Sequence, residues 1–202
     1  MDKSLLNTAK QHLRKTDSVM LRLTKEAELP TPSASGQPHY HALVRAIINQ
    51  QLSVKAGRTI EKRLLNAQGG RYFNAVKLLQ LKATALRECG ISHNKIRYIH
   101  TLAQAITDGE LNFRKLAKQD DDRVRDTLTR YPGIGQWSAD MFLISSLRRP
   151  DVFPIGDLVL RKAMQRHYQL PDSTNQETYV SIAEAWRPYR TIASYYLWTS
   201  TD

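Results

Sequence analysis

Apolar residues recur along this chain at the spacing of a helix rather than that of a strand. Ile96, Ile99, Ala103 and Ile106 are separated by three, four and three residues, so one helical face carries them all. The segment 137–147 is apolar over a wider arc. Its two adjacent stripes are Ala139, Phe142, Leu143 and Leu147, and Trp137, Met141 and Ile144. A helix apolar over so wide an arc is expected to be largely buried.

The same patterning, interrupted by helix breakers, predicts helices along most of the chain. The breakers include the pairs Gly69-Gly70 and Asp108-Gly109. Apolar and polar residues do not alternate with a period of two, which is the pattern of a half-buried strand. We therefore predict an all-α fold, with further helices near residues 4–14, 17–28, 39–49, 53–67, 72–79, 82–88, 112–118, 120–130, 157–168, 175–186 and 190–200.

One segment, Pro30–Pro38, resembles a linker, and it is too short to separate two freely moving domains. We find no internal repeat with a period of about 20–50 residues. A chain of 202 residues can form one large domain or two small lobes, and it can bury a sizeable core. Composition alone does not decide between the two.

Net charge adds information about partners. The formal net charge is +11 and the sequence pI is about 9.9. This excess of basic residues favours a polyanionic partner, nucleic acid first and an anionic membrane surface second. A membrane partner is disfavoured because no apolar run approaches the ~18 residues of a spanning helix, and the N-terminal residues lack the pattern of a signal peptide.

Cysteine and histidine usage argues against metal or disulfide chemistry. The single cysteine, Cys89, excludes an intramolecular disulfide and any four-cysteine metal site, so we interpret it as a small core residue in a reducing, intracellular compartment. His39 and His41 flank Tyr40 and cannot share one helical face. No spacing of histidine, cysteine and acidic residues suggests a zinc site.

The run Leu128–Ala139 (Leu-Thr-Arg-Tyr-Pro-Gly-Ile-Gly-Gln-Trp-Ser-Ala) joins two segments of helical composition. Its glycines, Gly133 and Gly135, allow a tight turn and the close approach of a phosphate. The following helix presents its N-terminal N–H groups, where the helix dipole favours an anion. Such a hairpin can hold one nucleic-acid phosphate without reading a base. The alternative is an ordinary helix–helix connection, since Pro-Gly occurs in many loops.

Asp157 stands at the start of a predicted helix, in the segment Val152–Leu160. A helix N-terminus favours the charged form of a carboxylate, which could then stabilise a nearby cation or orient a water molecule. The alternative is plain N-terminal capping, for which aspartate is a preferred residue. The order of hairpin, helix, loop and aspartate favours the functional interpretation.

In this order the segments resemble those of the helix-hairpin-helix DNA glycosylases, and among them the DNA-3-methyladenine glycosylase II (alkylbase) family, in a form without the N-terminal sheet domain of some members. The resemblance covers about residues 42–200 and rests on Ala46–Ser53 (Ala-Ile-Ile-Asn-Gln-Gln-Leu-Ser), Tyr131–Trp137, the Asp157 loop and Tyr189–Trp198. It implies one compact two-lobed helical unit over residues 1–202, with a central lobe at about 45–135, a second lobe from both termini and a cleft.

The resemblance also implies roles for individual residues. Asp157 would be the catalytic carboxylate that offsets the oxocarbenium-like charge on the deoxyribose. Trp137 occupies the place where lyase-competent relatives carry a Schiff-base lysine, so no abasic-site lyase activity is expected. Trp137 would stack on an extruded cationic base, unless it is a core residue. The implied base pocket consists of Trp137, Trp198, Tyr189, Met141 and Leu158.

For the DNA-binding surface, the resemblance implies that Gln51 or Leu52 fills the gap left by a flipped nucleotide. Alternatively, Gln50 and Gln51 cap neighbouring helix ends. Lys55, Arg58 and Lys62 form a stripe suited to phosphates or simply a solvated face. The implied DNA contacts are Gly133, Ile134, Gly135, Gln136, Gln50, Gln51, Leu52, Ser53, Lys55 and Arg58. The carbonyls of Thr129, Tyr131 and Gly133 would hold Na⁺ or K⁺, and no other cofactor is expected.

The expected function is that of a monofunctional DNA glycosylase in base excision repair. It would act as a monomer on double-stranded DNA, flip alkylated purines such as 3-methyladenine and 7-methylguanine, and excise them by hydrolysis. Two alternatives remain open at this point: a glycosylase for deaminated or oxidised bases, and a non-catalytic module that binds damaged DNA.

Overall fold

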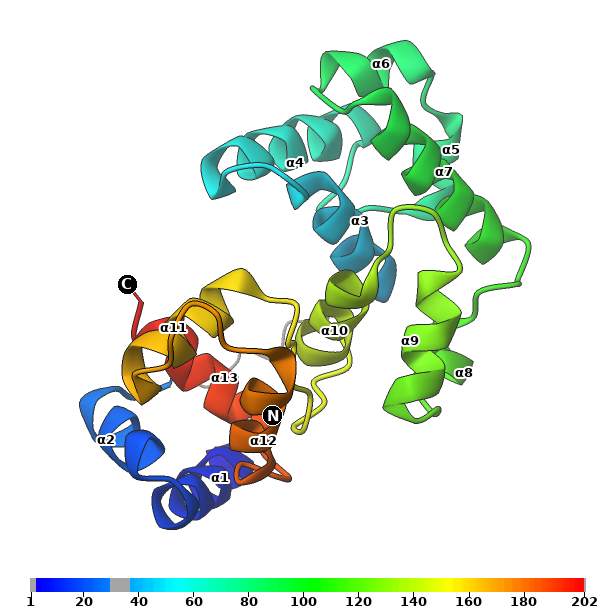
Figure 1. Ribbon diagram of the computed structural model, residues 1–202. Coiled ribbons are helices and arrows are strands. Elements are labelled where there is room, and N and C mark those ends of the chain that lie inside the picture. The colour runs from blue at the N-terminus through cyan, green and yellow to red at the C-terminus, as the bar shows by residue number, and fades with distance from the viewer. Residues whose placement is uncertain (1–2, 30–36, 202) are drawn as a thin grey trace. The chain divides into compact units, whose positions relative to one another are not determined.

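The computed structural model describes residues 3–29 and 37–201, and every regular element in these ranges is a helix. The prediction of an all-α fold is confirmed (Figure 1). Residues 30–36 of the predicted linker lie outside the described residues. The helices are α1 (Lys3–Thr16), α2 (Ser18–Glu26), α3 (His39–Asn49), α4 (Val54–Gln68), α5 (Ala75–Gln80), α6 (Ala83–Glu88), α7 (His93–Thr107), α8 (Phe113–Leu116), α9 (Asp121–Thr129), α10 (Gln136–Ser145), α11 (Leu158–Tyr168), α12 (Gln176–Glu184) and α13 (Arg190–Thr199).

Short polar side chains set the start of many of these helices. Each accepts a hydrogen bond from a backbone N–H in the first turn and so satisfies a donor that has no partner within the helix. These N-cap residues are Asp17, Ser53, Asn74, Ser92, Asn112, Asp120, Asp157 and Asn175.

Two predicted helix boundaries were wrong for local reasons. The helix expected at 72–79 begins at Ala75, because Asn74 caps it and Phe73 is buried before it. The helix containing the apolar stripes ends at Ser145, so Leu147 does not belong to it.

Contacts divide the chain into two compact units: unit 1 is residues 1–35 and 148–202, and unit 2 is residues 36–147. The core of unit 1 combines side chains from α1, α2, α11, α12 and α13. Its fully buried members include Leu13, Met20, Leu160, Met164, Trp186, Ile192 and Leu197.

In unit 2, α3 lies at the centre and packs against α4, α7 and α10. The apolar faces of these helices supply most of the core, and removal of their area from water stabilises the unit. Cys89 is buried here and free, as its interpretation as a core residue predicted. The core includes Leu43, Ile47, Ile48, Leu64, Leu78, Ile99, Leu102, Leu128 and Leu143.

Candidate functional site

The hairpin between α9 and α10 is a tight turn closed by backbone hydrogen bonds. The Tyr131 N–H donates to the Leu128 carbonyl and the Ile134 N–H to the Tyr131 carbonyl, both at 3.1 Å. Ile134 is buried and anchors the turn in unit 2. Gly135 is the N-cap of α10, and no side chain caps this helix N-terminus. The turn therefore presents a helix start to solvent, which is the geometry that an anion site requires.

Gly133 allows this turn for two reasons. Its φ is +84°, a backbone conformation that side chains disfavour. A Cβ at this position would lie 2.2 Å from Cδ2 of Tyr98 on α7, whereas a Cβ at Gly135 would meet nothing within 4 Å. Gly133 is thus constrained by the interior of unit 2, whereas Gly135 has open space at its Cβ position.

Residues 50–53, named here the wedge loop, connect α3 to α4. Gln51, Leu52 and Ser53 are exposed, whereas the Gln50 side chain turns inward and donates to the Gly133 carbonyl at 2.6 Å. Ser53, rather than either glutamine, caps α4. Gln50 occupies the C-cap position of α3, and its side chain bonds to the hairpin rather than to a helix end.

A cavity of about 500 Å³ in unit 2 opens beside the wedge loop and is lined by Asn49, Gln50, Gln51, Ser92, Asn94, Lys95, Tyr98 and Trp137. The Trp137 residue is 36% exposed, in contrast to the buried position that its apolar stripe predicted. Met141 follows one turn later on α10 and is half-buried. The remaining apolar residues of α10, including Phe142 and Leu143, are buried as expected.

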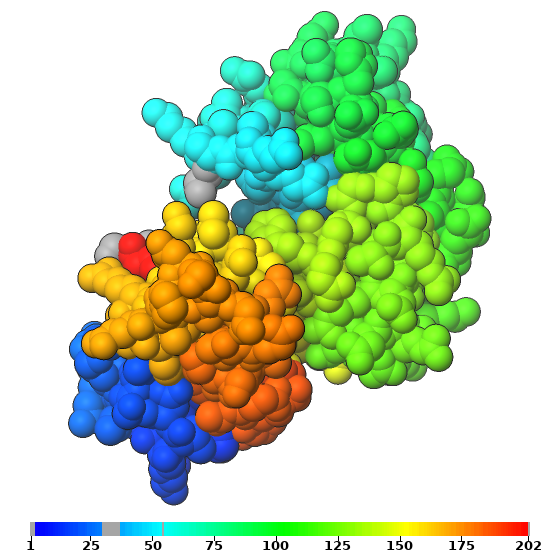
Figure 2. All heavy atoms as spheres, viewed as in Figure 1, coloured from blue at the N-terminus to red at the C-terminus, as the bar shows by residue number. Residues whose placement is uncertain are grey.

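The predicted basic stripe lies on the exposed face of α4. Lys55, Arg58 and Lys62 are all exposed, and Figure 2 shows α4, in cyan, with long side chains that extend into solvent. A second depression of about 430 Å³ at the start of this helix is lined by Ser53, Lys55, Ala56, Thr59, Ile60, Arg63 and Gly90. Such a surface suits backbone phosphates.

Asp157 in unit 1 is the N-cap of α11 and accepts a second hydrogen bond from a side chain of α13. Its Oδ1 caps α11 by accepting from the Leu160 N–H at 2.8 Å, and the same atom accepts from the Trp198 indole N–H at 3.0 Å. The residue remains partly exposed, and its neighbour Leu158 is 56% exposed. These two bonds fix the orientation of the carboxylate on a residue that is partly exposed.

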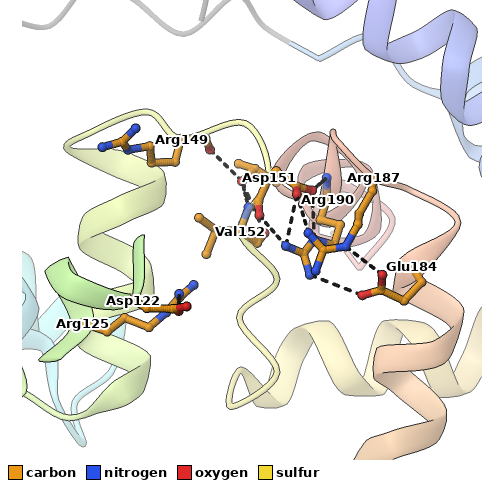
Figure 3. A network of polar contacts seen from close by, with 9 residues as sticks. Asp122, Arg125, Arg149, Asp151, Val152, Glu184, Arg187 and Arg190 are labelled. Atoms are coloured by element: carbon orange, nitrogen blue, oxygen red, sulfur yellow. Dashed lines mark hydrogen bonds and ion pairs between the residues drawn. The ribbon is translucent and has the colours of Figure 1, made fainter. Parts of the chain in front are cut away.

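The loop that precedes Asp157 is fastened to the start of α13. The Thr191 hydroxyl donates to the Arg149 carbonyl at 2.8 Å and accepts from the Val152 N–H at 2.9 Å. The Asp151 carboxylate accepts from Nε of Arg190 at 2.8 Å and from Arg187 at 2.9 Å. Figure 3 shows the guanidinium groups of Arg187 and Arg190 directed toward Asp151. Together with the Trp198 bond, the contacts of Arg190 and Thr191 make α13 a support of the Asp157 loop.

Of the other predicted pocket aromatics in unit 1, Trp198 and Tyr189 are both half-buried against the unit 1 core. The ring of Tyr189 contacts His12 edge-on, with centroids 5.4 Å apart, and that of Trp198 contacts Tyr195 at 5.6 Å. Trp198 is thus brought to Asp157 by a hydrogen bond, and Tyr189 is packed against α1.

This sequence matches the family model of HhH-GPD superfamily base excision DNA repair proteins over residues 44–188. The chain belongs to this superfamily.

Within the superfamily, several relatives in sequence are named DNA-3-methyladenine glycosylases. DNA-3-methyladenine glycosylase 1 of Schizosaccharomyces pombe is 30% identical, and the alignment covers 97% of this chain and 88% of the relative. Bacillus subtilis YfjP is 29% identical over 88% of this chain and 64% of its own length, so this chain spans just under two thirds of that relative. The alkylbase family inferred from the motifs is confirmed.

Solved structures agree with this assignment. The S. pombe 3-methyladenine DNA glycosylase Mag1, in complex with abasic DNA, has a TM-score of 0.87 at 29% identity, with 96% of each chain covered. A DNA-3-methyladenine glycosidase from Bacillus halodurans has a TM-score of 0.82 at 31% identity, with 95% of this chain and 88% of that chain covered. The helix-hairpin-helix fold predicted from the sequence is confirmed.

Several residues of this superfamily member that the sequence patterns do not single out contribute to the site. Lys95 on α7 donates to the carbonyls of Ile48 at 2.8 Å and Gln50 at 2.7 Å, and burial lowers the pKa of this lysine. Arg190 and Thr191 fasten the Asp157 loop. The segment Tyr189–Trp198 is conspicuous in the sequence for its aromatic residues, and its polar residues give no separate signal.

Two of the three carbonyls predicted to hold a monovalent cation already have hydrogen-bonded partners. The Tyr131 carbonyl accepts from Ile134, and the Gly133 carbonyl accepts from Gln50. Because a carbonyl oxygen has two lone pairs, these bonds leave each oxygen able to accept one more contact. The cation at Thr129, Tyr131 and Gly133 stays a prediction.

Among the described helices, none combines the length and the apolar character needed to cross a membrane.

Proposed function

We propose that this protein is a monofunctional DNA glycosylase that flips alkylated purines, 3-methyladenine foremost, out of double-stranded DNA and hydrolyses their N-glycosyl bond. The observation that carries the proposal is Asp157, an oriented and partly exposed carboxylate at the start of α11. It stands in a chain whose relatives are named for 3-methyladenine excision.

The chemistry explains why one carboxylate suffices. Departure of the base builds positive charge on the deoxyribose, and a negatively charged oxygen nearby stabilises that charge and helps to activate the attacking water. A purine alkylated at N3 or N7 is already cationic and leaves without prior protonation. The reaction therefore needs Asp157 and no second carboxylate as general acid.

Trp137 supports the hydrolytic version of this reaction. An indole has no nucleophilic amine, so no Schiff base can form at this position and the product is an intact abasic site. Trp137 is 36% exposed at the start of α10, and the electron-rich face of its indole would favour stacking on a cationic base.

DNA binding is assigned to features of unit 2. The Gly133–Gln136 turn would hold a phosphate, Gln51 or Leu52 would fill the space left by the flipped nucleotide, and the exposed face of α4 would track the backbone. The net charge of +11 favours the duplex and disfavours self-association, so we propose that the protein acts as a monomer.

Single-turnover excision from duplexes that each carry one modified base tests the substrate class. The bases are 3-methyladenine, 7-methylguanine, hypoxanthine and 8-oxoguanine, and sodium borohydride is added in a parallel reaction with abasic DNA. We expect release of 3-methyladenine and 7-methylguanine at the highest rates and no trapped covalent adduct.

Release of hypoxanthine or 8-oxoguanine without release of the methylated bases would contradict the proposed substrate class and favour a glycosylase for deaminated or oxidised bases. Binding to all duplexes with release of no base would leave only a damage-binding module. A borohydride-trapped adduct would show that a lysine of this chain forms a Schiff base.

A further inference from the structure

Unit 2 contains a chain of hydrogen bonds that joins the wedge loop to the phosphate-binding hairpin. We propose that Lys95 and Gln50 are positioning residues, which hold these two DNA-binding elements in register so that base extrusion and phosphate binding occur together. This inference rests on the proposed function, since it concerns how the same protein opens the duplex.

Lys95 forms the first part of the chain. From the first turn of α7, its ammonium group donates to the carbonyls of Ile48 and Gln50, the last of which is the residue directly before Gln51. These carbonyls lie at the C-terminal end of α3, where the helix dipole favours a cation. The side chain is half-buried, so the bonds are charge-assisted and poorly replaced by water.

Gln50 forms the second part. Its main chain is held by Lys95, and its side-chain amide donates to the Gly133 carbonyl at 2.6 Å and lies 3.5 Å from the Ser138 hydroxyl. One residue is thus bonded to α7 through its carbonyl and to the hairpin through its amide. A change in the position of the wedge loop must displace the hairpin or break one of these bonds.

The backbone of Gln51 explains why such support is needed. Its φ is +57°, a conformation that residues with a side chain rarely adopt. Such conformations persist where the surroundings determine them. The bond from Lys95 to the preceding carbonyl, and the bond from the Leu52 N–H to the Asn49 carbonyl at 3.2 Å, hold the peptide on both sides of Gln51.

Tyr98, one turn after Lys95 on α7, holds the same hairpin from another side. Its ring lies so close to Gly133 that a Cβ there would overlap it. Helix α7 therefore contacts the hairpin through Tyr98 and the wedge loop through Lys95. One helix, α7, therefore positions both the hairpin and the wedge loop.

The test separates duplex opening from chemistry by comparing two substrates. The first is a duplex with 7-methylguanine paired to cytosine, and the second carries the same base opposite a tetrahydrofuran gap, where little pairing must be broken. In Lys95→Met, we expect single-turnover excision from the paired duplex to fall by at least about tenfold, the scale of one lost charge-assisted bond. Excision from the unpaired duplex should fall by less than about threefold.

A second readout does not depend on catalysis. A duplex with 2-aminopurine at the target position reports extrusion as a change in fluorescence when the protein is added at saturation. Wild type should give the full change, and Lys95→Met a small fraction of it. If wild type excises no base but gives the fluorescence change, the proposed function fails while this inference is still tested.

Two control variants and a second test variant accompany this comparison. Lys95→Arg keeps a donor of the same charge. Its ratio of excision rates, paired duplex over unpaired duplex, should return to at least half of the wild-type ratio. Lys77→Met removes another lysine that donates to a helix-end carbonyl, that of Gly69 at 2.6 Å, and should leave the ratio unchanged. Gln50→Leu removes the side-chain amide at similar volume and should repeat the Lys95→Met result. If Lys95→Met does not fold, the Gln50→Leu result tests the proposal alone.

Equal losses on the paired and unpaired substrates would overturn the proposal, because they would indicate a general structural defect. Wild-type excision and fluorescence in both Lys95→Met and Gln50→Leu would overturn it as well.

Discussion

Gly133 and Gly135, two residues apart in one turn, differ in what a side chain would meet. Gly133 has a positive φ and lies against the Tyr98 ring, so its constraint belongs to the fold. Gly135 has a φ of −92° and open space at its Cβ position, so nothing within unit 2 requires glycine there. We therefore propose that glycine at this position serves the close approach of a ligand.

From this difference we predict opposite results for two alanine variants. Gly135→Ala should bind duplex DNA about tenfold more weakly, because the methyl group occupies the space of a phosphate, and it should unfold at the wild-type temperature. Gly133→Ala should lower the unfolding temperature because of the Tyr98 overlap. Fluorescence anisotropy and thermal denaturation of both variants measure the two effects. Wild-type affinity in Gly135→Ala would remove the hairpin from the DNA interface.

How far single residues can be predicted depends on where their partners lie in the sequence. The capping role of Asp157 is identifiable from its place before a helix, whereas its catalytic role is a prediction that the family resemblance implies. The inward position of Gln50 is not, since its partner Gly133 is 83 residues away and no local pattern encodes that contact. The exposure of Trp137 is not predictable for a similar reason. Helical periodicity shows that its face of the helix is apolar, but it does not show whether a distant segment covers that face.

At the scale of elements, α13 supports the Asp157 loop at two places. Arg190 and Thr191 in its first turn hold residues 149–152, and Trp198 near its end donates to the Asp157 carboxylate. The aromatic pattern of this helix suggests a base pocket. The hydrogen bond from its indole N–H indicates, in addition, that Trp198 orients the Asp157 carboxylate.

We predict that Trp198→Phe lowers the single-turnover excision rate by about tenfold, the effect of one lost hydrogen bond to a charged group. The enzyme concentration at half-maximal rate should change little, since this bond does not contribute to DNA binding.

Trp186→Phe is the matched control. Its indole N–H also donates to an aspartate, Asp17, at 2.9 Å, but in the buried core of unit 1. That variant should lose thermal stability and keep its excision rate. If both variants lose the same fraction of activity, the orienting role of Trp198 is wrong.

Element types are predictable from the sequence and element ends less so. Apolar periodicity locates the helices because burial of one face imposes it. Helix α5 begins later than the pattern suggests, because Asn74 caps it and Phe73 packs against the ring of His41, 4.9 Å between centroids. The hydrogen bond from the Phe73 N–H to Nδ1 of His41, at 3.2 Å, fixes this boundary through a residue 32 positions away.

For the molecule as a whole, the net charge of +11 is enough to indicate a polyanionic partner. The division into two units is not visible in composition, because both chain ends combine in one core. That arrangement is encoded in contacts such as those of Trp186 and Tyr168 with Asp17, more than 150 residues apart.

Global stability should fall in mild acid because of His41. Burial, together with the nearby Arg45, lowers the pKa of this histidine from 6.5 to about 4. The unfolded chain then binds a proton at a pH where the folded protein does not, so the free energy of unfolding decreases as pH falls from about 6.5 to about 4. Urea denaturation across this range measures the decrease. His41→Asn keeps a side-chain acceptor and cannot titrate, so its decrease should be smaller; an unchanged pH dependence would contradict the assignment.

The central claim is that Asp157 acts through its charge and does more than cap a helix. Asparagine caps helices as well as aspartate does, so Asp157→Asn removes the charge and leaves α11 intact. Asp120→Asn makes the same change at the cap of α9 and serves as the control.

The decisive measurement is single-turnover release of 3-methyladenine by the wild type, Asp157→Asn and Asp120→Asn, with duplex affinity measured in parallel. We predict a loss of several orders of magnitude in Asp157→Asn alone, with duplex affinity within about threefold of wild type in all three proteins. Release by Asp157→Asn at a rate near that of the wild type would contradict the account.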